Sequence, residues 1–219
     1  MATLAELKSR IADDLARDDL TTQIAAAITD AITIYQAERF RFSDANQVTP
    51  VTFQTVLQQT VYTSADKAEI GTLYLFDYLN VQIANVNFQL TRRTPEEIHL
   101  LLQQNTQVGQ PTDFAYEGQA ILFYPAPSMA YTITIGGHML VPGPTSDSDN
   151  TNVWVNEGAR LIRARAKYEL AMHVTDDEQL AARMSPHAES PGVAYFERNR
   201  LKATGNKITG RGRMTSMAW

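Results

Sequence analysis

The chain has 219 residues, with 19 Lys and Arg against 24 Asp and Glu, a net charge of −5 and no Cys. The absence of Cys excludes disulfide scaffolds, thiolate nucleophiles and Cys-ligated metal sites. Residues 1–11 carry charged side chains rather than the apolar stretch of a signal peptide, and no apolar run reaches the roughly 18 residues of a membrane span. We therefore expect a soluble globular protein that is made in the cytoplasm.

The charge is unevenly distributed along the chain. Residues 1–43 hold five basic and seven acidic side chains, residues 44–150 hold three and ten, and residues 151–219 hold eleven and seven. An acidic middle is thus followed by a basic final third. The net negative charge argues against a dedicated duplex-DNA binder, because such a protein neutralises phosphates with Lys and Arg.

Residues 1–43 show the apolar spacing of two helices. Apolar side chains recur every three or four residues in two groups, which puts each group on one helix face. The groups are Leu4, Leu7, Ile11 and Leu15, then Ile24, Ile28, Ala31 and Tyr35. Asp18 and Asp19 stand between the groups and are expected to cap the second helix. The segment is therefore predicted to be an N-terminal helical hairpin.

Residues 44–150 change to short runs rich in Val, Ile, Thr, Tyr and Phe, the composition of β-strands. The runs are residues 52–63, 71–79, 86–90, 120–124 and 130–141. One short helix interrupts them, with Thr94 as its N-cap, Pro95 in its first turn and an end near Gln104. Residues 142–150, with the sequence PGPTSDSDN, are predicted to be a linker at the end of this β-rich region, since Pro, Gly, Ser and Asp favour turns.

Residues 151–203 are predicted to form C-terminal helices. Apolar side chains at helical spacing indicate one long helix over residues 153–174. A further helical stretch begins at Asp176, but Pro186 and Pro191 interrupt it because proline cannot continue a helix.

Residues 204–219 contain three Gly and no apolar repeat, which predicts an extended basic tail. The candidate contact residues of this tail are Lys207, Ile208, Arg211, Arg213, Met214, Met217 and Trp219. Exposed Met and Trp lower solubility unless a partner receives them, so we interpret the tail as a strap that orders on binding another protein. An arm that binds nucleic acid is the alternative interpretation. Taken together, the elements predict an α+β fold with one compact domain and a tail.

No residue pattern points to catalysis or to a cofactor. The four His, at positions 99, 138, 173 and 187, lack the i, i+3 or i, i+4 spacing that aims two ligands at one metal. The sequence has no motif of a phosphate-binding loop, a zinc protease or a serine hydrolase. Its acidic residues do not single out a pair for glycoside hydrolysis. We expect no catalytic residue, no cofactor and no metal site.

Three cations form a stripe on the long C-terminal helix. Arg160, Arg163 and Lys167 are spaced i, i+3 and i+7, which places them on one face. One interpretation is a solvated face whose partners are Glu157 and Glu169 of the same helix. The other is a contact with an acidic surface of another subunit or of a different partner protein, because Arg forms planar bidentate ion pairs.

The order of these parts resembles the head-to-tail adaptor proteins of tailed bacteriophages, over about residues 3–204. The resemblance rests on the opening LAELKSRIADDLARDDLTTQIAAAITDAITIYQAERF, the middle segments LTRRTPEEI and GQPTDFAYEGQAILFYPAP, and the closing EGARLIRARAKYELAMHV. The sequence GQPTDFAY followed by a strand that ends in YPAP is the most distinctive of these. The likeness is greatest to the adaptors beneath the portal of short-tailed phages.

The resemblance implies a non-enzymatic structural protein of the virion, located at the neck between head and tail. Such an adaptor joins the portal protein after DNA packaging, as a homo-oligomeric ring that is typically a dodecamer. The ring extends the DNA conduit, closes the packaged head and docks the tail nozzle, tail fibres or other tail components. DNA passes through its lumen without specific binding, and the C-terminal segment clasps the portal. The alternatives are a virion-associated peptidoglycan hydrolase and a DNA-binding module.

Overall fold

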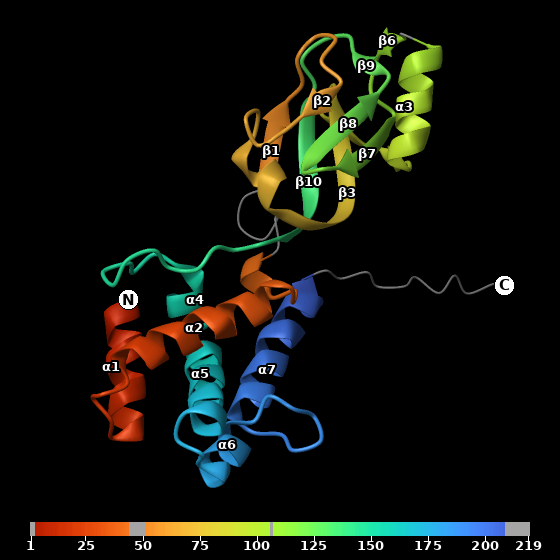
Figure 1. The fold of residues 1–219 in the computed structure, drawn as a ribbon. Coiled ribbons are helices and arrows are strands. Elements are labelled where there is room, and N and C mark those ends of the chain that lie inside the picture. The colour runs from red at the N-terminus through yellow and green to blue at the C-terminus, as the bar shows by residue number, and fades with distance from the viewer. Residues whose placement is uncertain (1–2, 44–50, 106, 209–219) are drawn as a thin grey trace, which may run out of the picture. The chain divides into compact units, whose positions relative to one another are not determined.

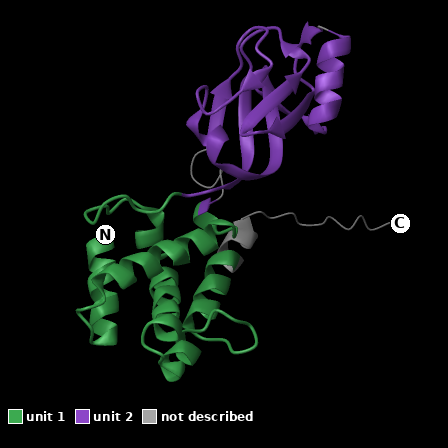
Figure 2. Ribbon diagram, viewed as in Figure 1, with its two compact units in different colours: residues 1–42, 142–219 green, residues 43–141 purple. Residues whose placement is uncertain are grey.

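The chain folds into two compact units. The computed structural model describes residues 3–43, 51–105 and 107–208, with side chains as far as Lys202. Figure 2 shows one unit of residues 1–42 and 142–219 and another of residues 43–141. The α+β class is confirmed, since both helices and strands are present. The expectation of one compact domain was wrong, because the strands of the middle segment pair with one another and enclose a core of their own.

The helical unit combines helices from the beginning and the end of the described sequence (Figure 1). They are α1 (Leu4–Leu15), α2 (Thr21–Gln36), α4 (Val153–Asn156), α5 (Ala159–His173), α6 (Glu178–Met184) and α7 (Val193–Ile208). A 3-10 turn over Arg41–Ser43 follows α2. The central helix is α5, because α1, α2, α4, α6 and α7 all pack against it.

An aromatic cluster fixes the end of the α2 segment to α4. Trp154 of α4 is 1% exposed. Its ring centroid lies 4.9 Å from that of Phe42 and 6.1 Å from that of Phe40, both in edge-to-face geometry. Edge-to-face pairs add to the free energy that burial of the aromatic area supplies. The cluster therefore joins two segments that are more than a hundred residues apart in the sequence.

The helix expected over residues 153–174 is two helices, α4 and α5, which meet at Gly158. A Cβ atom on Gly158 would lie 3.0 Å from the carbonyl oxygen of Trp154, so a larger residue there would require the Trp154 backbone to move by a few tenths of an ångström. The break predicted by the two prolines is confirmed, since α6 ends before Pro186 and α7 begins after Pro191. Helix α7 reaches Ile208, five residues beyond the end expected for the C-terminal helices at position 203.

Asp18 and Asp19 do not cap α2. The N-cap position is Leu20, and no side chain caps the helix there. Asp19 instead forms a bidentate ion pair with Arg17, with two N to O distances of 2.7 Å. The predicted cap was therefore wrong, because Asp19 has a nearer cationic partner within the turn.

The Pro-, Gly- and Ser-rich segment of residues 142–150 belongs to the helical unit. The backbone N–H of Ala5 donates a 3.0 Å hydrogen bond to the carbonyl of Asp147. The Asp147 carboxylate also pairs with Lys8, at 2.6 Å. The segment predicted as a linker at the end of the β-rich region thus packs on α1.

The described residues of the second unit form two four-stranded sheets and a short two-stranded one. The first sheet has the order β1 (Val51–Gln54), β10 (Thr132–Met139), β3 (Leu73–Ile83) and β4 (Val86–Gln89). The second has the order β2 (Val61–Tyr62), β8 (Ala120–Tyr124), β7 (Asp113–Glu117) and β5 (Thr91–Arg92). The pair is β6 (Val108–Gly109) with β9 (Ala126–Pro127), and a 3-10 turn spans Ala68–Thr72.

The core of this unit lies between the two larger sheets. Phe53 of β1, Tyr62 of β2 and Phe123 of β8 meet there, with Tyr62 centroids 5.3 and 5.4 Å from the two Phe rings. Only the buried Leu90 separates β4 from β5, so the chain passes from the first sheet to the second at this residue. Strand switching of this kind closes one side of the core.

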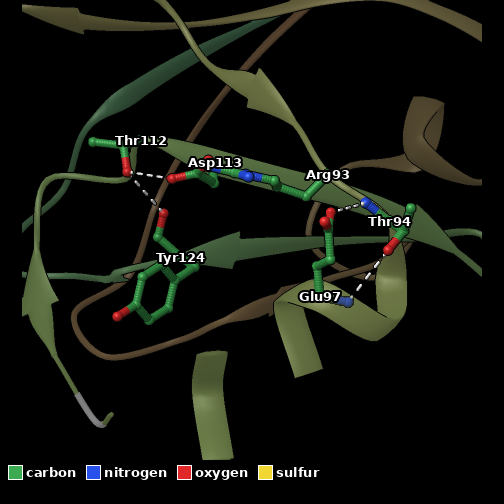
Figure 3. A network of polar contacts seen from close by, with 6 residues as sticks. All are labelled: Arg93, Thr94, Glu97, Thr112, Asp113 and Tyr124. Atoms are coloured by element: carbon green, nitrogen blue, oxygen red, sulfur yellow. Dashed lines mark hydrogen bonds and ion pairs between the residues drawn. The ribbon is translucent and has the colours of Figure 1, made fainter. Parts of the chain in front are cut away.

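The short helix α3 (Pro95–Gln104) begins where the sequence predicts. Thr94 and Glu97 form a capping box, in which Thr94 Oγ1 accepts from Glu97 N–H at 3.3 Å and the Glu97 carboxylate accepts from Thr94 N–H at 3.1 Å (Figure 3). Next to it, Arg93 pairs with Asp113 of β7 at 2.7 Å. These contacts attach the start of α3 to the second sheet, and Ile98 of α3 is fully buried there.

Candidate functional site

The cationic stripe on α5 divides into a paired part and an exposed part. Lys167 is 8% exposed and donates a 3.0 Å hydrogen bond to the Asp14 carboxylate of α1. The same carboxylate lies 3.4 Å from Arg163. Arg160 is exposed and forms no ion pair among the residues that the structure describes. Only the outer end of the predicted stripe is therefore available to a partner without breaking a contact.

One interpretation of the stripe was that its cations pair with Glu157 and Glu169 of the same helix. The described residues do not form these pairs. Glu169 pairs with Arg165, at 2.5 Å, and with His173, at 3.4 Å. The partner of Arg163 and Lys167 is Asp14 of another helix. Sequence reasoning missed Asp14 because spacing along one helix gives no information about the neighbouring helix.

The exposed Arg160 points away from α2. Arg165 lies beside Tyr35 of α2, where burial raises the pKa of the Tyr35 hydroxyl and the Arg165 charge opposes that rise. Five residues along a helix correspond to a rotation of about 140°, so Arg160 lies on nearly the opposite side of α5 from Arg165. This side of α5 has α1 on one flank and α7 on the other (Figure 1).

Among the described residues, hollows of about 200, 330 and 610 Å³ lie along that side, and Arg160 lines each of them. We call the surface that they share the α5 groove. It is defined by Arg160, Arg163 and Lys167 of α5, Leu7 and Arg10 of α1, and Val193, Glu197 and Arg200 of α7. Five of these eight side chains are cationic, and one is acidic. Ala159 and Ala164 form its floor, and small side chains there let another element approach closely.

Helix α7 carries three basic residues ahead of the proposed tail. Arg198 and Lys202 both contact Glu38, just after α2, at 2.7 and 2.5 Å. The hydrogen bond to Glu38 raises the pKa of Arg198. Arg200 pairs with Glu197 of its own helix at 2.8 Å and lines the α5 groove. These cations therefore anchor α7 to α2 or extend the groove.

Of the candidate contact residues of the tail, the structure describes only the first two, at the end of α7. Lys207 and Ile208 are its last residues, and their side chains lie outside the part that the structure describes. Arg211, Arg213, Met214, Met217 and Trp219 also lie outside the described residues. The proposed role of the tail consequently remains a prediction from the sequence.

Within residues 3–43, 51–105 and 107–208, no group of three or more His, Asp or Glu side chains is placed to hold a metal ion. His99 contacts Glu117 at 3.0 Å, and His187 contacts Tyr168 at 3.1 Å. His138 is buried, at 2% exposure, and packs against the ring of Tyr74. None of the helices in the same described ranges is long and apolar enough to span a bilayer.

The helical unit carries the α5 groove, and the unit of residues 43–141 has a core of its own. The sequence matches the family model of the SU10 adaptor protein over residues 2–190. The chain therefore belongs to the SU10 adaptor protein family. The members of this family are structural head-to-tail adaptors of bacteriophage virions. Adaptors of this kind interact with portal and tail components. No curated protein matches the sequence.

Proposed function

We propose that this chain assembles as a ring, typically of twelve copies, beneath the portal of a short-tailed phage. The ring extends the DNA conduit, closes the packaged head and docks the tail nozzle or tail fibres. The observation that carries the proposal is the family match over residues 2–190. It is supported by the α5 groove, a basic surface whose exposed cation, Arg160, forms no ion pair among the residues that the structure describes.

The charge distribution fits a conduit that does not retain DNA. The unit of residues 43–141 has three basic and eight acidic side chains, so a wall formed by this unit repels phosphates. The basic side chains of the described helices are largely engaged with carboxylates, as Lys167 is with Asp14. DNA therefore passes through the ring without specific binding.

We also propose that the tail clasps the portal through Lys207, Ile208, Arg211, Arg213, Met214, Met217 and Trp219. Because α7 is helical to Ile208, a deletion of residues 209–219 leaves the described helix intact. The deletion should abolish attachment to the portal while the far-ultraviolet circular dichroism of the protein stays unchanged.

The test mixes the purified full-length chain with the portal protein of its own phage and images the product by electron microscopy. An added ring on the portal supports the proposal, and its loss on deletion of residues 209–219 assigns the contact to the tail. A matched control replaces Arg211 and Arg213 by Gln, which separates the role of charge from that of Met214, Met217 and Trp219. A portal that gains no density from the full-length chain would refute the adaptor ring.

A further inference from the structure

One side of α2 is exposed in the described chain, and most of its side chains are small enough to pack closely against another element. Ala26, Asp30 and Thr33 are exposed and spaced i, i+4 and i+7, and Ala37 continues the row at the end of the helix. We call these four residues the α2 outer face. Asp30 is its only charged residue and forms no ion pair within the described ranges.

The threonine hydroxyls on this side of α2 already have hydrogen-bond partners. The Thr29 hydroxyl donates to the Ala25 carbonyl at 3.1 Å, and the Thr33 hydroxyl donates to the Thr29 carbonyl at 2.9 Å. Burying these hydroxyls leaves no unsatisfied donor, which removes the usual cost of covering a polar helix face. Ile34, at 43% exposure, adds an apolar side chain beside the face.

The α5 groove has the complementary character. Its floor is formed by alanines, its flank carries Val193 at 43% exposure, and its exposed cation is Arg160. The α2 outer face is small and carries one unpaired carboxylate, whereas the groove is concave and carries cations. A helix with small side chains and one acid is the occupant that this groove fits.

The two surfaces lie on different sides of the same unit, because α2 packs on α5 through its buried face and Arg160 points away from α2. One copy therefore cannot fill its own groove with its own α2. A contact between two different surfaces of identical subunits is heterologous, and such contacts close into rings when the rotation between subunits allows.

We propose that the α2 outer face of one copy lies in the α5 groove of the next copy, with Asp30 paired to Arg160. This inference rests on the proposed ring and names the two surfaces that form its subunit contact. The occupant is a second copy of this chain rather than DNA, since the α2 outer face supplies a carboxylate for Arg160 and small side chains that can approach the alanines of the groove.

The first test exchanges the charges. Asp30→Arg and Arg160→Asp should each weaken ring formation on the portal about tenfold or more, because each places like charges in contact. The double variant restores the attraction with reversed signs and should recover most of the assembly. Asp18→Arg and Arg183→Asp, at exposed positions outside both surfaces, are the matched controls and should assemble normally.

The second test uses the absence of Cys from the chain. Thr33→Cys in one preparation and Val193→Cys in another place single thiols on the α2 outer face and in the α5 groove. A short bis-maleimide should cross-link the two preparations when they are mixed on the portal. Each preparation alone should give no cross-linked dimer, because the contact is heterologous.

The outcomes separate this inference from the proposed function. If rings form but the mixed preparations do not cross-link and the charge exchange does not rescue assembly, the assigned contact is wrong while the adaptor ring stands. If Arg160→Asp instead removes a salt-sensitive shift of duplex DNA and leaves ring formation unchanged, the groove binds DNA and the inference is overturned. If the unaltered chain forms no ring on the portal, the proposed function fails first.

Discussion

Lys167 of α5 donates a 3.0 Å hydrogen bond to Asp14 of α1, although 153 residues separate them in the sequence. Lys167 is nearly buried, whereas the Asp14 side chain keeps about a third of its surface exposed. The pair attaches α1 to the central helix of its unit. Because Asp14 also contacts Arg163, Arg160 is the only cation of the stripe without an ion pair among the described residues.

Replacement of Asp14 by Ala should destabilise the helical unit by about 1–3 kcal/mol, because it leaves the buried ammonium of Lys167 without a counter-charge. Chemical denaturation followed by circular dichroism gives the free energy of unfolding. The control is Asp13→Ala, which removes an adjacent exposed carboxylate and should change stability by less than about 0.5 kcal/mol. Equal effects of the two variants would show that the Asp14 contact contributes nothing specific.

The features that sequence reasoning predicted are those set by neighbours in the chain. The capping box of Thr94 and Glu97, three residues apart, is one example, and the stop at Pro186 is another. The features it missed depend on distant segments. The Asp14 contact and the close approach of Gly158 to Trp154 are of this kind.

Three further features were also missed. Strand β7 (Asp113–Glu117) pairs with β8 across a two-residue turn at Gly118 and Gln119, both with positive φ, but its ends are the acids Asp113 and Glu117, which strands disfavour. Residues 142–150 have the composition of a linker, but composition does not determine which unit a turn packs against. The candidate groove likewise combines residues from three helices, of which only the α5 cations were identified as a group.

Replacement of Trp154 by Ala should destabilise the helical unit by about 3–5 kcal/mol, because it leaves a cavity beside the stacked rings of Phe40 and Phe42. Because the variant loses one of the two Trp of the chain, chemical denaturation followed by circular dichroism gives the free energy of unfolding of both proteins. Phe196→Ala is the control, since Phe196 is 61% exposed and its truncation should cost little. A small loss for Trp154→Ala would mean that the aromatic cluster repacks without it.

The β unit should lose stability in acid through Asp66. Its carboxylate accepts hydrogen bonds from Thr63 N–H at 2.8 Å and from the Gln59 amide at 2.9 Å. The Thr63 hydrogen bond lowers the pKa of Asp66 in the folded state. The contribution is therefore present above the unfolded Asp pKa of about 3.9 and is lost as pH falls through the lower folded value.

The variant Asp66→Asn removes this titration. Its free energy of unfolding should fall less steeply between about pH 5 and pH 3 than that of the parent, since fewer protons are taken up on unfolding. Glu96→Gln removes an exposed carboxylate of the same unit and serves as the control. Parallel pH profiles for the parent and Asp66→Asn would contradict the assignment.

Glu38 should control how firmly α7 is held. It contacts Arg198 at 2.7 Å and Lys202 at 2.5 Å, and α7 leads directly to the proposed portal-clasping tail. Glu38→Gln removes the charge that both cations face, so the helical unit should lose about 1–2 kcal/mol, and the α7 amides should exchange hydrogen faster. Glu197→Gln is the matched control, because Glu197 pairs with Arg200 within α7, where such pairs contribute only about 0.2–0.5 kcal/mol. Faster exchange in α7 for Glu197→Gln but not for Glu38→Gln would show that α7 is held by its own side chains rather than by the end of α2.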